Sequence, residues 1–364
     1  MLKLSKRLFP CITTSPNEKN RLSRLNLQID RLFLQNLVDE ANSLKKDSAR
    51  RLTFLFGPWI CNFKCPDYCY TKGAKTGILT TKQTIEIIDQ ARKMGVQTTY
   101  WPGEGELTLL KSFWNIMGYQ NSISMPAVLF TNGSIFADNY LCKKTLGITP
   151  DELQNLLKTK FHNIHFYVKY WSSSQEKAAN MVGVSSGEYP YTSYEGRDIP
   201  SALAWLLEAI PKDRIGVEVM VSSENYEDVT ENILPTIEEL QIHGFVEPVI
   251  FSGNAEAKQL QFGLNSKQYN YLSDIFTSGG NYCEKRQSTE LIVRGTRLTP
   301  GIAIPPRDQD MVIGSERKIL DLFQIFHNDY FRRMRLFSEK LNGCLCRAFW
   351  NGKINDPTKN PQIL

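Results

Sequence analysis

The sequence lacks the long apolar stretches that would place the protein in a membrane or mark it for secretion. No apolar run approaches the roughly 18–20 residues that a membrane-spanning helix needs. The opening residues, MLKLSKRLFPCITT, are basic but contain no apolar stretch of the roughly 7–15 residues typical of a secretory signal. Internal repeats and low-complexity tracts are also missing. We therefore expect a cytoplasmic protein without a membrane partner.

The sequence has no large excess of charge of one sign. Its 364 residues include 43 Lys and Arg and 38 Asp and Glu, so the net charge is only +5. A value this small gives no indication of nucleic-acid binding. Because 41% of the residues are hydrophobic and 22% are charged, the chain can form a sizeable core. The length suits one large α/β domain with a smaller appendage.

Histidine is scarce, and this affects how the cysteines are interpreted. Of four histidines, the one nearest to the cysteine loop CNFKCPDYCY is His162. In a reducing compartment, clustered cysteines are metal ligands or catalytic groups rather than disulfides. Cys61, Cys65 and Cys69 lie close together in this loop, and three thiolates can cap three irons of a cubane cluster. A structural zinc site would need a fourth ligand nearby, so the pattern favours iron–sulfur over zinc.

From Leu52 onward, short β-rich runs alternate with helical stretches. Such alternation predicts an α/β fold with a parallel sheet and right-handed crossovers, here a partial (β/α)6 barrel. The loops that follow the strands would then meet at one rim. The expected strands are 52–57, 96–101, 126–130, 165–171, 215–222 and 246–250, and the expected helices are 80–95, 201–210, one ending near 119, one beginning near 150 and one ending near 240. Residues 172–199 are expected to form a long polar loop.

The chain is predicted to have three parts. Residues 1–50 form a helical leader, because apolar side chains follow a helical spacing between positions 21 and 44. Residues 51–252 form the partial barrel. After about residue 252 the alternation stops, and residues 253–364 form a small C-terminal α+β extension. In this extension we expect a hairpin over 289–304 and a long helix over 315–341.

Glycine-rich segments follow the second and third expected strands. The second strand ends in Pro-Gly-Glu-Gly-Glu at 102–106, and the third in Thr-Asn-Gly at 131–133. Together with the cysteine loop, these segments resemble the radical S-adenosylmethionine superfamily over residues 50–252. In that family the loop usually reads CxxxCxxC, and the second strand ends in GGEP or GxGEP. Here the loop is one residue longer, and Leu107 follows the glutamate instead of proline.

The resemblance implies two cofactors and a radical reaction. Cys61, Cys65 and Cys69 would hold a [4Fe–4S] cluster, and the open iron would chelate the amino and carboxylate groups of S-adenosylmethionine. An external one-electron reductant would supply the electron that cleaves the cofactor reductively. The resulting 5′-deoxyadenosyl radical would abstract hydrogen from the substrate, and the protein would keep it dry and aimed at one bond.

Further cofactor contacts follow from the same resemblance. Tyr70 would lie near the adenine, and Gly105 and Glu106 match the glycine and glutamate of GxGEP. Glu106 would accept a hydrogen bond from the amino group of the cofactor. Lys169 would reach the cofactor carboxylate or the substrate, although a surface lysine is an equally simple interpretation. Three residues stand at or after later strand ends, where the family contacts the cofactor: Asn132, Ser222 and Asn225.

A second set of cysteines lies outside the expected barrel. Cys283, Cys344 and Cys346, with a hairpin and a helix between them, resemble the auxiliary-cluster extension called SPASM, or its shorter twitch form. That resemblance implies an auxiliary [4Fe–4S] cluster, although Pro306 stands where the family usually has a cysteine. Alternatively, the three are buried free thiols, because cysteine is a small core hydrophobe. Cys142 is expected to be an ordinary thiol or a missing ligand.

Three functions remain open on the sequence. The auxiliary-cluster extension is frequent among enzymes that mature ribosomally synthesised peptides, and such an enzyme would need a separate leader-peptide-binding protein here. The second reading is a radical enzyme for a small molecule such as a nucleoside or sugar. The third is a non-enzymatic metal-binding interaction protein.

Overall fold

The computed structural model describes a continuous central region and shorter pieces around it. The described residues are 51–55, 60–66, 69, 79–249, 259–265, 267–268, 271, 290–295, 297–299, 311–312, 314–315, 318–319 and 321–327. The expected helical leader, Tyr70 and the three C-terminal cysteines Cys283, Cys344 and Cys346 lie outside the described residues. Among the helices that are described, none is both long and apolar enough to cross a bilayer.

The six expected strands form one parallel sheet. Each strand pairs in parallel with the next in the order of the chain, which confirms the α/β alternation inferred from the sequence. No closed barrel forms in the described residues, because β1 and β8 are not paired with each other. The strands are β1 (Arg51–Leu55), β2 (Thr98–Trp101), β3 (Ala127–Thr131), β4 (Ile164–Lys169), β7 (Ile215–Val221) and β8 (His243–Pro248).

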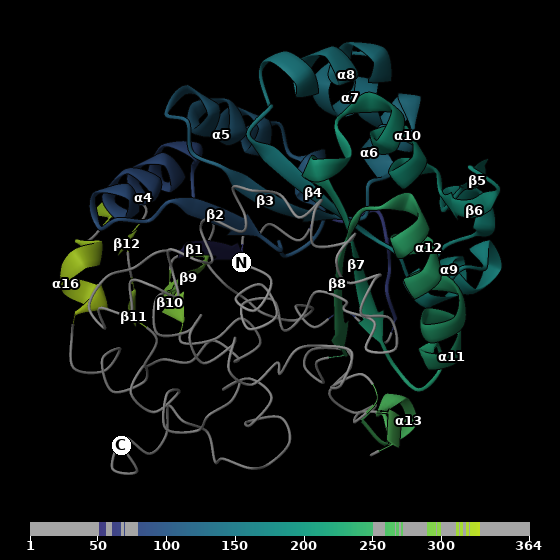
Figure 1. Ribbon diagram of the computed structural model, residues 1–364. Coiled ribbons are helices and arrows are strands. Elements are labelled where there is room, and N and C mark those ends of the chain that lie inside the picture. The colour runs from purple at the N-terminus through teal and green to yellow at the C-terminus, as the bar shows by residue number, and fades with distance from the viewer. Residues whose placement is uncertain are drawn as a thin grey trace.

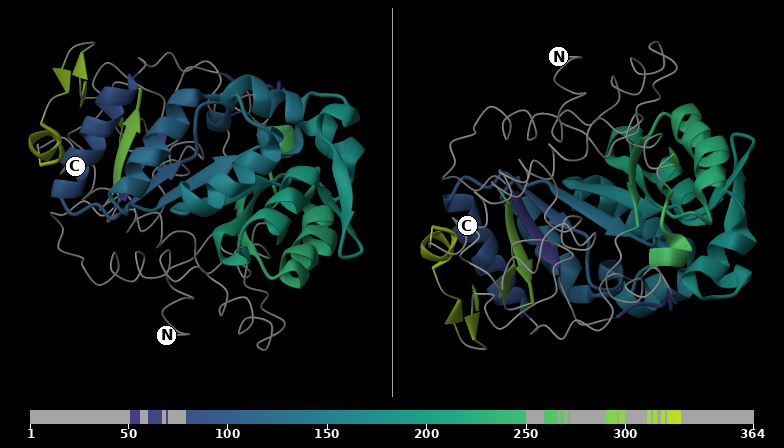
Figure 2. Two further views of the ribbon diagram at one scale, coloured as in Figure 1. Left: turned by 90° about the horizontal axis from the view of Figure 1, so that it is seen from above. Right: turned by 90° about the horizontal axis from the view of Figure 1, so that it is seen from below.

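The C-terminal hairpin extends this same sheet. β9 (Glu290–Arg294) pairs in parallel with β1, so the described sheet has seven adjacent parallel strands. β10 (Arg297–Thr299) returns antiparallel to β9, and β11 (Met311–Val312) pairs with β10. The sheet order is β11-β10-β9-β1-β2-β3-β4-β7-β8. Figure 2 shows β9 beside the purple strand β1 in the view from below.

Helices cover the outer face of the sheet in an arc (Figure 1). They include α4 (Thr81–Lys93), α5 (Lys111–Ser122), α8 (Pro150–Thr159), α10 (Ser201–Ala209) and α12 (Leu234–Leu240). Local signals set their starts: Thr80 with Gln83 and Thr149 with Glu152 form capping boxes at α4 and α8. The shorter elements are η1 (Leu107–Leu109), α6 (Ser134–Ala137), α7 (Asn139–Leu146), η2 (Ser186–Glu188), η3 (Lys212–Arg214), α11 (Tyr226–Asp228), η4 (Val229–Ile233) and α13 (Gln259–Phe262).

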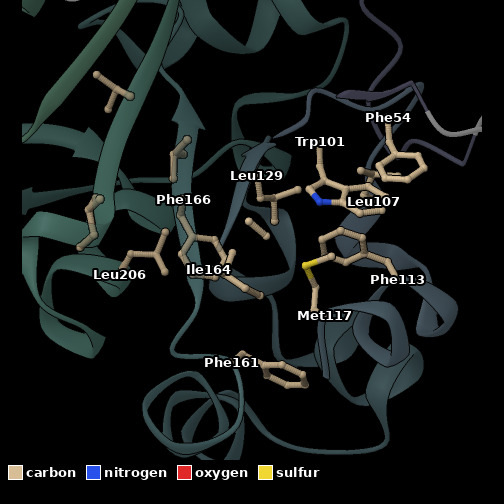
Figure 3. Packing of buried hydrophobic residues seen from close by; sticks show 14 of the residues in the cluster. Phe54, Trp101, Leu107, Phe113, Met117, Leu129, Phe161, Ile164, Phe166 and Leu206 are labelled. Atoms are coloured by element: carbon tan, nitrogen blue, oxygen red, sulfur yellow. The ribbon is translucent and has the colours of Figure 1, made fainter. Parts of the chain in front are cut away.

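The main core lies between the sheet and the helix arc. Trp101 of β2 stacks on Phe54 of β1 with ring centroids 4.2 Å apart, and Phe113 of α5 meets it edge-on at 5.6 Å. Figure 3 shows this cluster, with Leu129 and Phe166 continuing it along the next strands. Burial of large apolar side chains on this face fixes which side chains of each strand point to the opposite face.

Two expectations about secondary structure were wrong. The polar segment 172–199 contains α9 (Gln175–Val182) and a hairpin of β5 (Tyr191–Tyr194) and β6 (Arg197–Pro200). The polar composition concealed this helix, which is short but has a Ser174 cap. The helix expected from 315 instead follows two short strands, β12 (Gly314–Ser315) and β13 (Lys318–Ile319). There α16 (Leu322–Phe326) begins only after Asp321, whose side chain accepts hydrogen bonds from the first turn.

Candidate active site

The three segments singled out in the sequence meet at the carboxyl ends of β1, β2 and β3. The backbone N–H of Glu106 donates to the carbonyl of Ile60, the residue before Cys61, at 2.7 Å. Asn132 Nδ2 donates to Asn62 Oδ1 at 2.9 Å, and the Ser134 hydroxyl donates to the same oxygen at 3.2 Å. The cysteine loop is therefore hydrogen-bonded to both glycine-rich segments, as expected for loops at the carboxyl edge of a parallel sheet.

Gly105 allows the closest of these approaches. Its backbone has a φ of +104°, a conformation that side chains disfavour. A Cβ at this position would lie 2.6 Å from the carbonyl oxygen of Ile60, much closer than a van der Waals contact. Leu107, which replaces the proline of the family pattern, is 1% exposed and packs in the main core. The glycine is thus required where the cysteine loop crosses the second strand end.

The carboxylate of Glu106 is buried and accepts four hydrogen bonds. Oε1 accepts from the Thr108 N–H at 3.1 Å, the Thr108 hydroxyl at 2.6 Å and the Thr131 hydroxyl at 2.7 Å. Oε2 accepts from the Asn132 N–H at 2.6 Å. Oε1 accepts three of these bonds and Oε2 only one, so Oε2 is the oxygen that can accept a further donor. The sequence did not reveal this structural role, since nothing in it connects the side chains of Thr108 and Thr131 with the Glu106 carboxylate.

The other carboxylate of the segment, Glu104, has a different partner. Arg294 Nε of β9 lies 2.6 Å from Glu104 Oε1, and the side chains are 4% and 0% exposed. Such a pair is stable only when both charges stay together, because either one alone would be buried without compensation. The two residues are 190 positions apart. No local signal in the sequence could have connected them.

The three cysteines lie in the rim loop and form no disulfide with one another. Cys61 is exposed, and Cys65 and Cys69 are partly buried. Although Cys61 is exposed as a residue, loss of water around its thiol raises the pKa to about 12, and the charge of Glu106 contributes. The charges of the other two cysteines also raise it. The pKa of a metal-bound thiol would behave oppositely, because coordination deprotonates it.

These thiols suit a cluster better than a single ion. A tetrahedral zinc site requires its ligands around one point, whereas in a cubane each thiolate binds a different iron. Three soft sulfur donors on one loop, with no histidine among them, fit an iron–sulfur cluster by donor chemistry.

Lys169 forms an ion pair within the sheet. Its Nζ lies 2.5 Å from Glu218 Oε2 on β7, the neighbouring strand, where the two residues are in register. Burial alone would lower the pKa of Lys169, but Glu218 outweighs this and raises it, as do the nearby charges of Cys65 and Glu106. The side chain is 24% exposed, so this is not a free surface lysine. Glu218 was missed, although a single charge in the apolar run IGVEVMV was a usable signal.

Ser222 and Asn225, which were predicted to contact the cofactor, form hydrogen bonds with each other and with the protein backbone. Asn225 Oδ1 accepts from the backbone N–H of Ser222 at 2.8 Å and from its hydroxyl at 3.3 Å. Asn225 Nδ2 donates to the carbonyls of Trp171 and Met220. Both Ser222 and Asn225 are buried after β7. Their side chains shape the turn at this strand end. Asn132, which follows β3, lies next to the first cysteine, with its Nδ2 4.0 Å from Cys61 Sγ.

Comparison with known proteins finds similarity at the level of structure. No protein-family model and no curated protein matches the sequence. The fold is that of α/β proteins with a partial barrel of parallel strands. Among solved structures it is similar to Streptococcus suis SuiB bound to the precursor peptide SuiA, with a TM-score of 0.57 and 14% identity over 89% of this chain and 78% of that chain. SuiB bound to S-adenosylmethionine gives 0.57 and 15% over 89% and 80%.

Proposed function

We propose that this protein is a radical S-adenosylmethionine enzyme. The observation that carries the proposal is the joining of the cysteine loop to both glycine-rich strand ends through Ile60 and Asn62. In this proposal Cys61, Cys65 and Cys69 hold a [4Fe–4S] cluster whose open iron binds S-adenosylmethionine. With an electron from an external reductant, the bound cofactors would supply a 5′-deoxyadenosyl radical that abstracts a hydrogen atom from the substrate.

The described residues support specific roles around these cofactors. Glu106 Oε2, which accepts only one hydrogen bond within the protein, suits the amino group of S-adenosylmethionine. Gly105 adds no side chain at that strand end that would obstruct the cofactor. Lys169, held by Glu218 near the charges of Cys65 and Glu106, suits the cofactor carboxylate or an acidic group of the substrate. The turn residues are proposed to shape the rest of the cofactor pocket, with Tyr70 at the adenine: Asn132, Ser222 and Asn225.

For the substrate we propose a ribosomally made peptide. The support is the similar fold of SuiB, which was crystallised with its precursor peptide. A separate leader-peptide-binding protein and an auxiliary [4Fe–4S] cluster on Cys283, Cys344 and Cys346 belong to this proposal. A small-molecule substrate is the competing outcome. Short peptides encoded beside the gene should increase the rate of 5′-deoxyadenosine formation, and a nucleoside or sugar that did so instead would reassign the substrate.

The enzyme assignment is tested on anaerobically reconstituted protein. Dithionite-reduced protein should convert S-adenosylmethionine slowly to 5′-deoxyadenosine and methionine, as followed by liquid chromatography. Cys65→Ala should abolish this turnover, whereas Cys142→Ala should retain it, because Cys142 is buried on α7 within the main core. Stable zinc binding without nucleoside product would support the metal-binding interaction protein instead.

Iron and sulfide analysis of the same samples tests the number of clusters. The wild type should hold two cubane clusters, and replacing Cys283, Cys344 and Cys346 together by alanine should remove about half of the iron. A wild-type protein with only four irons would show that these three cysteines are not cluster ligands.

A further inference from the structure

The segment between β4 and β6 contacts the cysteine loop directly. The backbone N–H of Lys64 donates to the carbonyl of Val182, the last residue of α9, at 3.0 Å. Phe63 is 7% exposed and packs in a small cluster with residues of this segment. Its ring meets Tyr189 edge-on with centroids 5.3 Å apart. The cluster also contains Trp171, Ala178, Ala179, Val182, Met220, Val249 and Phe262, with Cys65 packed against it.

Gly183 brings the end of α9 onto the loop. Its φ is +69°, and a Cβ there would lie 3.0 Å from the carbonyl oxygen of Lys64 and 3.3 Å from Cδ of Pro66. A side chain at this position would therefore be strained by its backbone and would also push against the loop. Gly105 approaches the carbonyl of Ile60 in a comparable way.

The segment is itself fastened to the strand ends. The Tyr189 hydroxyl donates to the carbonyl of Lys169 at 2.8 Å. At its start, Asp228 accepts from the Ser172 hydroxyl at 2.6 Å and from the Ser173 N–H at 2.8 Å. Movement of α9 away from the sheet would have to break these bonds. The residues of α9 that contact the cysteine loop are thus held in place by hydrogen bonds at both ends of the segment.

The two anchors occupy equivalent places along the loop. Ile60 precedes Cys61 and is bound by Glu106, whereas Lys64 precedes Cys65 and is bound by Val182. Each of the first two cysteines thus follows a residue whose backbone is hydrogen-bonded to a different part of the fold.

We propose that Phe63 and Gly183 are positioning residues, through which α9 holds the cysteine loop in the conformation that binds the cluster. This inference rests on the proposed function, since it requires a cluster on Cys61 and Cys65. Ligands held in their bound geometry lose less entropy on binding, so release of iron should be slow while the contacts between α9 and the cysteine loop are intact.

The test compares two glycines of the same segment. Gly183→Ala is the test variant, and Gly196→Ala in the β5–β6 turn is its control, because Gly196 has a φ of +79° but nothing within 4 Å of its Cβ position. Both are reconstituted as holoprotein, and release of iron to a chelator is timed. We expect Gly183→Ala to release iron about tenfold faster than Gly196→Ala, equivalent to about 1.4 kcal/mol. Because Gly183→Ala also crowds the loop, its apoprotein should unfold at a somewhat lower temperature than that of Gly196→Ala.

A second variant avoids backbone strain. Phe63→Ala should also speed iron release, and Phe63→Leu should recover part of the loss because it refills the site in the small cluster. Equal iron release from Gly183→Ala, Gly196→Ala and Phe63→Ala would overturn the inference while leaving the enzyme assignment intact. A wild-type protein that binds no cluster would overturn both. Electron paramagnetic resonance of the reduced proteins should differ from wild type only in the Phe63 and Gly183 variants.

Discussion

Replacement of Glu106 by glutamine tests the structural role of the buried carboxylate. The amide must turn its NH2 toward either the three donors on Oε1 or the Asn132 N–H on Oε2. In the better orientation the Asn132 N–H loses its acceptor, and the other three bonds become neutral. Since a hydrogen bond to a charged group contributes about 1.5–3 kcal/mol, we expect the unfolding free energy to fall by about 2–4 kcal/mol.

Two assays separate this effect from cofactor binding. Equilibrium denaturation of the apoprotein measures the structural loss, for which Thr131→Val should cost less because it removes only one of the four donors. Titration of the holoprotein with S-adenosylmethionine measures the second role, where loss of one charged hydrogen bond should weaken binding about 10–150-fold. Unchanged stability of Glu106→Gln would refute the hydrogen-bond network. A stability loss with unchanged cofactor affinity would refute only the proposed cofactor contact.

Three further changes test other parts of the site. Arg294→Met should lower the unfolding free energy by about 3–5 kcal/mol, because Glu104 would stay buried after losing the charge of Arg294, and adding Glu104→Gln should recover part of this loss. Although burial raises the pKa of Asp228, its serine donors hold it below the usual value. The contribution of Asp228 to stability should therefore be constant above about pH 4 and be lost below it, and Asp228→Asn should weaken the pH dependence of acid denaturation. Gly105→Ala should lower both unfolding temperature and iron content, whereas Gly147→Ala, with open space at its Cβ position, should leave iron content unchanged. Equal iron content in the two glycine variants would refute the close crossing.

Local signals in the sequence determined much of the barrel. Capping residues and apolar periodicity located α4 and α8, and the short apolar runs located six strands. The topology of parallel sheets then placed the cysteine loop, the GEGE segment and the TNG segment at one edge. This inference needs only the order of elements along the chain. For the same reason, the neighbourhood of Gly105, Glu106 and Asn132 could be predicted before their contacts were known.

The partners across the sheet were decided only by the tertiary structure. β9 pairs with β1, and Arg294 reaches Glu104, because the free edge of β1 accepts a strand from far along the chain. Similarly, α9 contacts Phe63 and Lys64 through packing and one backbone bond, neither of which leaves a pattern in the sequence. Periodicity and capping report the preferences of neighbouring residues, whereas these contacts depend on which distant surfaces the folded chain brings together. The sequence thus determined most of the elements and which loops share the rim, and the tertiary structure determined what holds the rim in place.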